Sequence, residues 1–464
     1  MKKLILTSLM LVLFSYQAYS QSSSDMLERV LSAVVTVAVE DMDDTAMLLG
    51  YRGAPANVAY EEPLDIGNAF GSGSGFVVQR NGRKYVVTNS HVVEYASNKP
   101  GAVVVYSINR TRYEMDIIGG DNMYDIAILA FRTQPGPEMS VVDYKKTQPR
   151  IGEPVYAVGN PRGNLPYTVS DGIIGALNRH LGGLTAKFGY LQSTATIFGG
   201  NSGGPLFDRN GDVIGINTFV ALGRENNGQM VRLPQVNYAL EPHIANRITN
   251  DVIANNGRVR RAWLGIELSD HFDRVQMGGR TFSRQANQHP ILTGVIPNSP
   301  AAASMSQFLN AQVTKVNGTS VRNVEEVFGV LEFVAPNSRV TFEMMLPGGT
   351  TRTVEVASQE LAPDKNMAVA RHLSRFDSNV SFQQATNDQV VLTYQGVPYN
   401  VDGVGIENIQ VWRVNTINDL GVGARFAAMG GIVEVIVSRP GQEQQKLTLN
   451  LSGRSDRNTC VLWY

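Results

Sequence analysis

The feature that most restricts the fold of this chain is a succession of short apolar runs between residues 27 and 250. The runs are rich in Val, Ile and Tyr, and Gly, Asn, Asp or Pro commonly separates them. Branched and aromatic residues favour strands, and turn signals at short intervals favour an all-β barrel or sandwich. We predict strands at 34–37, 75–78, 85–88, 103–106, 126–129, 155–158 and 213–216, with a long surface loop over 40–70.

Composition supports packed domains and excludes some functions. At roughly 150 residues per domain, 464 residues suggest two to four domains. A hydrophobic content of 43% is too high for a disordered chain. With 40 basic and 41 acidic residues, the chain lacks the basic character of a nucleic-acid-binding protein, so we expect no nucleic-acid partner.

The amino terminus predicts export. Lys2 and Lys3 precede an apolar run over Leu4–Phe14, and Ala18 and Ser20 supply small residues at −3 and −1, which predicts a signal peptide at 1–20. The alternative, a retained anchor, is disfavoured because a span needs about 20 apolar residues. No later stretch could cross a bilayer, so no stable span is expected after cleavage. A single cysteine, Cys460, rules out an internal disulfide and favours a periplasmic location.

Beyond residue 254, the chain contains a short internal repeat. A polar stretch, Asn255–Arg258, separates the first β-rich block from the remainder. The segments Val340–Gly348 and Val433–Gly441 resemble each other, and a second alternating strand follows each of them. Two related small domains, at 258–361 and 368–455, would explain the repeat, although two unrelated hairpins would also match over so short a length.

Three segments carry residues typical of a serine hydrolase, in the order His91, Asp125, Ser202. The serine lies in a glycine-rich loop, and we expect the amides of Gly200 and Ser202, on either side of Asn201, to form an oxyanion hole. His91 would accept the Ser202 proton through one ring nitrogen. Asp125 would hold the proton on the other nitrogen and stabilise the imidazolium. Each segment alone is a weak signal, but their order and the GNSGGP string are specific together.

At this point the chain resembles the HtrA (Deg) family of trypsin-like serine proteases that carry PDZ domains. The motifs that carry the resemblance are GSGSGF at 71–76, TNSHVV at 88–93, YDIAIL at 124–129, VGNP at 158–161, VSDGI at 169–173, GNSGGP at 200–205 and GINT at 215–218. The resemblance implies a mainly β protein: a chymotrypsin-like double β-barrel protease domain at 25–254, a PDZ domain at 258–361 and a degenerate PDZ-like domain at 368–455. It also implies a homotrimer or a multiple of trimers.

The residues around the serine loop predict substrate preference and control. The family usually has Asp where this chain has Thr194 and Asn where it has Phe198, which puts specificity in doubt more than chemistry. Thr196 is expected at the base of the S1 pocket, where the lack of an acid favours small or medium apolar P1 residues. Asn201 cannot pair with a new amino terminus, so loop ordering is the better candidate for control. A substrate would add as a strand to the segment Asn217, Thr218 and Phe219.

The second block carries the landmarks of a PDZ domain. The residues Trp263, Leu264, Gly265 and Ile266 are expected to form the loop that receives a peptide carboxylate. Asn298–Ala302 and Val316–Gly318 also fit the family pattern, whereas Asn310 and Ala311 and a polar insertion after Ile266 depart from it. A small β domain that binds nothing remains an alternative. The final block serves assembly or is purely structural.

The expected function is an ATP-independent serine endoprotease that cleaves unfolded or damaged exported proteins, with PDZ domains binding peptide carboxyl termini. No nucleotide motif is present, the other five histidines lack metal-ligand spacing, and no metal or cofactor is expected. Two alternatives stay open. One is a PDZ-based chaperone or sensor with a latent protease domain, and the other is an esterase that uses the same triad.

Overall fold

The structure is a computed structural model of the chain. It describes residues 23–43, 46–47, 49, 71–160, 167–179, 189–224, 230–285, 288–362, 365, 368, 379–384, 390–406, 410–415, 433–449 and 459–463. The expected signal peptide lies outside these residues. Within the described part of the chain, no helix combines the length and the apolar character needed to cross a bilayer.

A closed six-stranded barrel forms the first half of the protease block. Two short helical elements lead into it, α2 (Ser23–Val30) and η1 (Leu31–Ala33). The strands close in the order β1-β2-β3-β6-β5-β4 around a core of valine, leucine and alanine side chains. Their bounds are β1 (Val34–Val39), β2 (Gly71–Arg80), β3 (Arg83–Thr88), β4 (Val103–Tyr106), β5 (Arg112–Asp121) and β6 (Ile126–Phe131).

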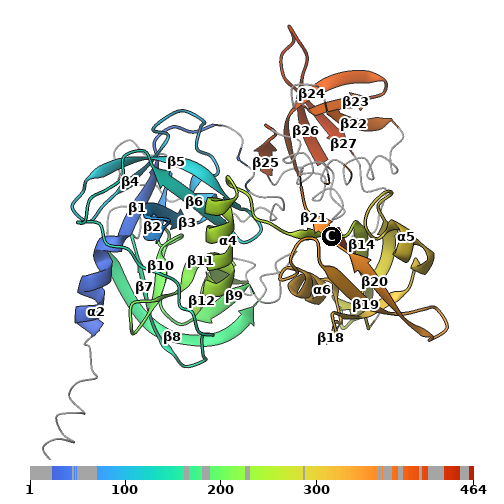
Figure 1. Cartoon of the computed structure of the whole chain (residues 1–464), viewed down its shortest axis with the longest axis horizontal. Coiled ribbons are helices and arrows are strands. Elements are labelled where there is room, and N and C mark those ends of the chain that lie inside the picture. Colours follow the sequence, from blue (N-terminus) through green and yellow to red (C-terminus); the bar gives the residue numbers. More distant parts are fainter. Residues whose placement is uncertain are drawn as a thin grey trace, which may run out of the picture.

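A second closed barrel follows, and it packs beside the first (Figure 1). Its strands close in the order β10-β11-β12-β9-β8-β7, and they are β7 (Pro154–Gly159), β8 (Thr168–Arg179), β9 (Tyr190–Ser193), β10 (Pro205–Asp208), β11 (Val213–Arg224) and β12 (Met230–Leu240). The helix α4 (Pro242–Ala254) then packs against β5, β6 and β11, so it joins the two barrels. The predicted chymotrypsin-like double barrel is confirmed.

All seven strands predicted in the first block are present, but the predicted surface loop over 40–70 is partly wrong. Most of that segment lies outside the described residues. Within it, Ala46 and Leu49 are buried, and the Leu49 N–H donates to Asn122 Oδ1 at 2.9 Å. The apolar run Ala46–Leu49 is the sequence signal for this anchor, and the Asp, Gly and Pro residues around it favoured a surface loop instead.

The second block is built on an antiparallel sheet with strand order β15-β14-β16-β17-β19-β20. Two helices, α6 (Val324–Leu331) and the short α5 (Ala302–Met305) with η3 (Ser306–Phe308), accompany it. The strand bounds are β13 (Ala262–Trp263), β14 (Ile266–Met277), β15 (Arg280–Gln285), β16 (Ile291–Val295), β17 (Gln312–Val316), β18 (Thr319–Ser320), β19 (Arg339–Met345), β20 (Thr351–Ala357) and β21 (Gln359–Glu360).

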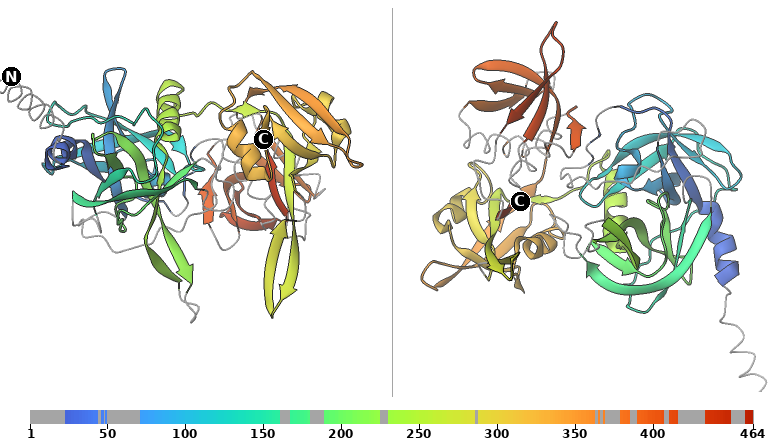
Figure 2. Two further views of the ribbon diagram at one scale, coloured as in Figure 1. Left: turned by 90° about the horizontal axis from the view of Figure 1, so that it is seen from below. Right: turned by 180° about the vertical axis from the view of Figure 1, so that it is seen from behind.

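The polar insertion after Ile266 is a hairpin, and Figure 2 (left) shows it projecting on the same side of the molecule as the β11–β12 hairpin. Gly278 and Gly279 form its turn, with φ of 59° and 73°. Positive φ at both central residues is typical of a type I′ turn, and a Gly-Gly pair between two strands is a hairpin signal. The sequence therefore held a local indication of this hairpin.

The third block is a separate sheet with strand order β22-β23-β24-β26-β27 (Figure 1). The strands are β22 (Val380–Gln384), β23 (Val390–Tyr394), β24 (Val397–Ile406), β25 (Gln410–Arg413), β26 (Val433–Ser438) and β27 (Gln445–Leu449). The two repeated segments form antiparallel hairpins, β19–β20 and β26–β27. Their neighbours differ, because β19 pairs with β17 whereas β26 pairs with β24. The division into domains therefore stays a prediction.

The last strand, β28 (Thr459–Trp463), does not join the third sheet. It pairs antiparallel with β14 of the second block, and it contacts α6. Figure 1 shows the carboxyl terminus at this place, over the second block. Nothing in the local sequence indicated this pairing.

The connection between the first two blocks is tightly packed. The backbone of Gly257 lies against Ile118 and Gly119 of β5, and a Cβ atom at Gly257 or Gly119 would clash with the facing main chain. Gly257 also has a φ of 85°, a region that favours glycine. One apolar cluster continues from the barrels through α4 to Val259, Ala262 and Leu264. The linker is therefore part of the folded core.

Candidate active site

The structure brings His91 and Asp125 into direct contact. The β3 strand ends at Thr88, and the single-turn helix α3 (Ser90–Val93) presents the imidazole. His91 Nδ1 lies 2.6 Å from Asp125 Oδ2, while the other carboxylate oxygen accepts from the His91 N–H at 2.9 Å and from Ser90 Oγ at 2.8 Å. These three bonds fix the position of the Asp125 carboxylate and the orientation of the His91 ring.

The electrostatics of the pair suit a general base. Burial by itself lowers the pKa of His91, but the charge and hydrogen bond of Asp125 outweigh burial and raise that pKa above its usual value. Burial by itself raises the pKa of Asp125, yet the His91 charge and three donors hold that pKa below its usual value. Asp125 is therefore ionised, and it stabilises a protonated His91.

Asp125 has an uncommon backbone conformation. Its φ is 52°, in the left-handed region, at the end of a turn that starts at Asp121. Within the turn, the Asp125 N–H donates to Asn122 O at 3.2 Å, and Asn89 Nδ2 donates to Asp125 O at 2.6 Å. Asp and Asn tolerate this region better than most residues, and the surrounding bonds hold Asp125 in it.

The loop that carries Ser202 is locked onto the first barrel by its glycines. Gly203 has a φ of 83°, and a Cβ atom there would clash with Ser74 O and Thr88 Oγ1. The Ser74 N–H donates to Ser202 O at 2.8 Å. A side chain at Gly203 would thus push the serine away from β2 and β3.

Gly200 lies two residues before Ser202, with a φ of 93°. Ser74 Oγ donates to Gly200 O at 2.7 Å and accepts from the Asn160 N–H at 2.8 Å. Asn201 is buried, its N–H donates to Phe198 O at 3.0 Å, and its carbonyl accepts from the Gly204 N–H at 3.0 Å. Ser74 is a site residue to which sequence reasoning gave no role, although it lies within one of the recognised motifs.

The three segments meet where the barrels adjoin. A Cβ atom at Gly73 would lie 2.6 Å from a Val92 methyl group and 2.9 Å from Ser202 O, so α3 and the serine loop touch the same point of β2. Among the described residues, no hydrogen bond joins the Ser202 hydroxyl to His91. Such bonds are often long in unliganded enzymes and shorten when substrate binds.

The residues expected around the S1 pocket lie between β9 and the serine loop. Thr196 is exposed, and its carbonyl accepts from Ser170 Oγ. Thr194 bonds to Ile173 through both its N–H and its Oγ1. Phe198 is 48% exposed, and the guanidinium of Arg232 lies 5.3 Å from its ring centroid. Arg232, on β12, is a contact that the sequence did not suggest.

One expected substrate-binding residue has another role. The Asn217 N–H donates to Gly204 O at 2.9 Å, and its carbonyl accepts from the Gly203 N–H at 2.8 Å. Both main-chain groups therefore support the serine loop, and the pairing of Asn217 with substrate stays a prediction. Thr218 is also buried, and its Oγ1 accepts from Asn89 Nδ2 at 3.3 Å. Phe219, half-buried, follows on β11.

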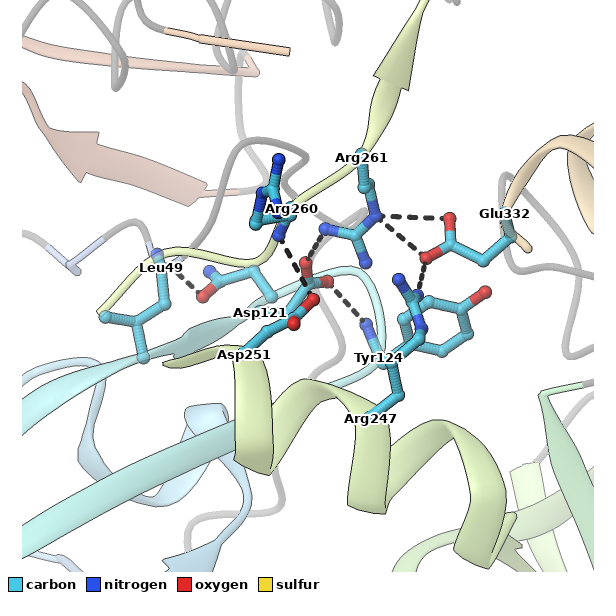
Figure 3. A network of polar contacts seen from close by, with 9 residues as sticks. Leu49, Asp121, Tyr124, Arg247, Asp251, Arg260, Arg261 and Glu332 are labelled. Atoms are coloured by element: carbon cyan, nitrogen blue, oxygen red, sulfur yellow. Dashed lines mark hydrogen bonds and ion pairs between the residues drawn. The ribbon is translucent and has the colours of Figure 1, made fainter. Parts of the chain in front are cut away.

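A buried ionic network lies directly behind the turn that ends at Asp125 (Figure 3). Arg261 comes from the second block and has no exposed side-chain surface. It bonds to Asp121 of the turn and, at 2.8 and 3.1 Å, to Glu332, which follows α6. Its guanidinium also lies 5.9 Å from the Tyr124 ring centroid. Arg247 of α4 completes the network by pairing with Glu332.

The expected carboxylate loop of the second block connects β13 to β14. Gly265 has a φ of 76°, and its carbonyl accepts from the Ile296 N–H at 2.8 Å. The Leu264 carbonyl accepts from the Ala301 N–H at 3.0 Å. The side chains of Trp263, Leu264 and Ile266 are buried. The Asn298–Ala302 landmark therefore holds this loop in place.

Two closed barrels, with a His–Asp pair and a glycine-framed serine at their junction, define a trypsin-like serine peptidase. A family described as "Trypsin-like peptidase domain" matches residues 73–216. The chain is 30% identical to "Serine endoprotease DegS" of Haemophilus influenzae, over 63% of this chain and 78% of that protein. The chain belongs to the HtrA (Deg) family of serine endoproteases, and it is a serine endopeptidase.

Other relatives agree. The chain is 27% identical to "Periplasmic pH-dependent serine endoprotease DegQ" of Escherichia coli, over 72% of this chain and 69% of that protein. Among solved structures, "HtrA-type protease AlgW with tripeptide" aligns with a TM-score of 0.53 and 21% identity, covering 74% of this chain and 98% of that one. This structural likeness supports the fold.

Proposed function

We propose that the protein cleaves peptide bonds through an acyl-enzyme formed on Ser202. The observation that carries the proposal is the buried His91–Asp125 pair beside a serine loop that is bonded to β2. His91 takes the Ser202 proton as the hydroxyl attacks the scissile carbonyl, and it then donates that proton to the leaving amine. Asp125 stays ionised and stabilises the imidazolium during both steps.

In the same proposal, the amides of Gly200 and Ser202 stabilise the oxyanion that forms on the substrate carbonyl. The Ser74 bonds to Gly200 O and Ser202 O support this role, because they restrain the loop before substrate arrives. Phe219 on β11 offers the strand to which a substrate backbone adds, with Thr196 and Phe198 bordering the P1 side chain. An extended or unfolded polypeptide is the substrate that such a strand accepts.

Incubation of the purified protein with unfolded casein tests the activity. We expect cleavage by the wild type and none by Ser202→Ala, together with labelling of Ser202 by a fluorophosphonate probe. Arg232→Ala serves as a matched variant that removes the Phe198 contact and a hydrogen bond to Asn237 Oδ1 but leaves the triad in place. It should alter the cleavage-site profile more than the labelling rate. Intact casein and an unlabelled wild-type serine would instead favour a binding protein with a latent protease block.

We further propose that the second block binds peptides by strand addition to β14, beside α6. The placement of β28 supports this, because Trp463 pairs with Glu267 and Thr459 with His271, so the strand runs toward the Leu264–Gly265 loop. In this arrangement β28 already fills the peptide site. A separate peptide would therefore have to displace it.

A labelled peptide with the sequence Thr459–Tyr464 tests the site. Truncation of the chain after residue 458 should increase peptide affinity at least about tenfold, because it removes a competitor at high effective concentration. A peptide with proline in place of Leu462 cannot donate to the ladder and should bind poorly to both forms. Equal affinity of the two forms would contradict occupation by β28, and no binding to either would exclude a peptide site here.

The proposed setting is the periplasm, in a homotrimer or a multiple of trimers. Relatives named as periplasmic endoproteases support the location, together with the amino-terminal sequence pattern. Cell fractionation tests the location, and light scattering during size-exclusion chromatography tests the assembly. A monomer at working concentration would contradict the proposed assembly.

A further inference from the structure

We propose that Arg261 is a positioning residue for catalysis, because it holds, through Asp121, the turn that carries Asp125. The proposal rests on the triad proposed above. It assigns to a residue of the second block a part in organising the active site of the first.

The turn from Asp121 to Asp125 depends on the Asp121 side chain. Its Oδ1 accepts from the Tyr124 N–H at 3.2 Å, one residue before Asp125. All five residues of the turn are buried, and Asp125 itself has a left-handed φ of 52°. A residue in that region keeps its conformation only while its surroundings impose it. A displaced Asp121 would therefore release the backbone that aims the Asp125 carboxylate at His91.

Asp121 in turn depends on Arg261. The Asp121 carboxylate is fully buried, and burial raises its pKa, whereas the facing Arg261 charge opposes that rise. A buried carboxylate is costly without a charged or hydrogen-bonded partner. Arg261 supplies both, and its guanidinium also covers the Tyr124 ring. Figure 3 shows Arg261 between Asp121 on one side and Glu332 on the other.

The other partner of Arg261 belongs to the second block. Glu332 caps the carboxyl end of α6, the helix that β28 contacts. Its carboxylate also pairs with Arg247 of α4, so two carboxylates face two guanidinium groups. A third carboxylate, Asp251 of α4, also interacts with the charges of Arg247 and Arg261. Removal of Arg261 leaves Asp121 without its charged partner, while Glu332 keeps Arg247. The main consequence should therefore appear at the turn of Asp125.

The test is Arg261→Met, assayed with a peptide substrate whose cleavage gives kcat and KM separately. Small displacements of a catalytic group can lower the rate by about 10²-fold, so we expect kcat to fall between ten- and a hundredfold. KM should change less than twofold, because β11 and β12 are not altered. Loss of the Asp125 contact also lowers the pKa of His91 toward its buried, unpaired value. The acid limb of kcat should thus move to lower pH. Glu94, the other acid that raises the His91 pKa, is unchanged in this variant.

The NMR signal of the proton shared by His91 Nδ1 and Asp125 gives a second readout. In protein labelled with ¹⁵N-histidine, this far-downfield signal should weaken or disappear in Arg261→Met. If Arg261 contributed only to stability, the folded molecules of the variant would keep both the downfield signal and the wild-type acid limb of kcat. Arg261→Lys keeps the charge without the planar fork, and it should restore part of kcat.

Two further variants keep the result interpretable. Arg260→Ala is the matched control. Arg260 is the neighbour of Arg261 in the sequence, but its side chain pairs with Glu360 at the surface, so this variant should leave kcat unchanged. If Arg261→Met fails to fold, Asp121→Leu with Arg261→Met removes both charges of the Arg261–Asp121 pair and should fold with the same kinetic defect. Wild-type kinetics and an intact downfield proton in the folded variants would overturn the inference. An inactive wild type would instead overturn the proposed function.

Discussion

The carboxyl-terminal blocks contact the first barrel through two arginines, and the two contacts differ in kind. Arg261 of the second block is fully buried, and both of its carboxylate partners are buried too. Arg413 of the third block pairs with Asp43, whose side chain is 44% exposed, and donates to the Ala96 carbonyl at 2.6 Å. The first contact reaches the turn of Asp125. The second reaches the segment that follows α3, the helix of His91.

The difference indicates how strongly each block is coupled to the site. A charge inside the protein needs its partner, whereas a half-exposed pair is replaced readily by water. The Arg413 contact is further supported by main-chain bonds around it, including Arg413 N–H to Ala46 O at 2.6 Å and Ser97 N–H to Asp41 O at 2.9 Å. We therefore expect the second block to be indispensable to the site and the third block to adjust it.

The largest expected effect is the loss of the Asp125 carboxylate itself, and the effects of the Arg261 and Arg413 variants can be compared with it. Asp125→Asn keeps the shape of the site but removes the carboxylate, and kcat should fall by about 10⁴-fold. In the wild type, Asp125 raises the pKa of His91. The acid limb of kcat/KM should therefore lie at a higher pH than an ordinary histidine would give. A pH–rate profile checks both statements. An acid limb at the same pH in Asp125→Asn would show that Asp125 does not act on His91.

The next effect separates the two contacts directly. Arg261→Met leaves a buried carboxylate unpaired, which typically costs about 3–5 kcal/mol, whereas Arg413→Met loses mainly charged hydrogen bonds worth about 2 kcal/mol. Hydrogen exchange followed by mass spectrometry should show faster exchange at 121–125 in the first variant and at 94–97 in the second. Equal changes at both segments in either variant would mean that the two contacts are not independent.

The smallest effect is on salt dependence. Asp43→Asn should cost at most about 1 kcal/mol at low ionic strength, and the cost should shrink further at about 0.5 M salt because exposed pairs are screened. Asp121→Asn, the buried counterpart, should show no such dependence. Thermal unfolding at two ionic strengths measures this. A salt-sensitive Asp121→Asn would place its carboxylate in contact with solvent.

What the sequence predicted well is local. Each strand of the barrels is a short run of branched residues between turn residues, so its existence needs no distant partner. The glycines around Ser202 are also a local signal, because the positive φ at Gly200 and Gly203 excludes most other residues. The order of His91, Asp125 and Ser202 then identifies the fold as well as the chemistry.

What the sequence did not predict depends on pairing across long separations. Arg260 and Arg261 are adjacent and alike, yet one lies at the surface and the other is enclosed by residues from three elements. No pattern distinguishes them before the chain is folded. The use of the Asn217 main-chain groups by the Ser202 loop is likewise invisible in the sequence. The same holds for β28, since any exposed strand edge accepts a partner.

The glycine contact between Gly119 and Gly257 has a consequence for motion. Two main chains touch there without intervening side chains, at the one place where the chain leaves the first block for the second. A swing of the second block about residues 255–261 would separate these backbones and pull Arg261 out of its enclosure. The first two blocks should thus move as one body, and a larger assembly would be built from that body rather than from freely pivoting parts.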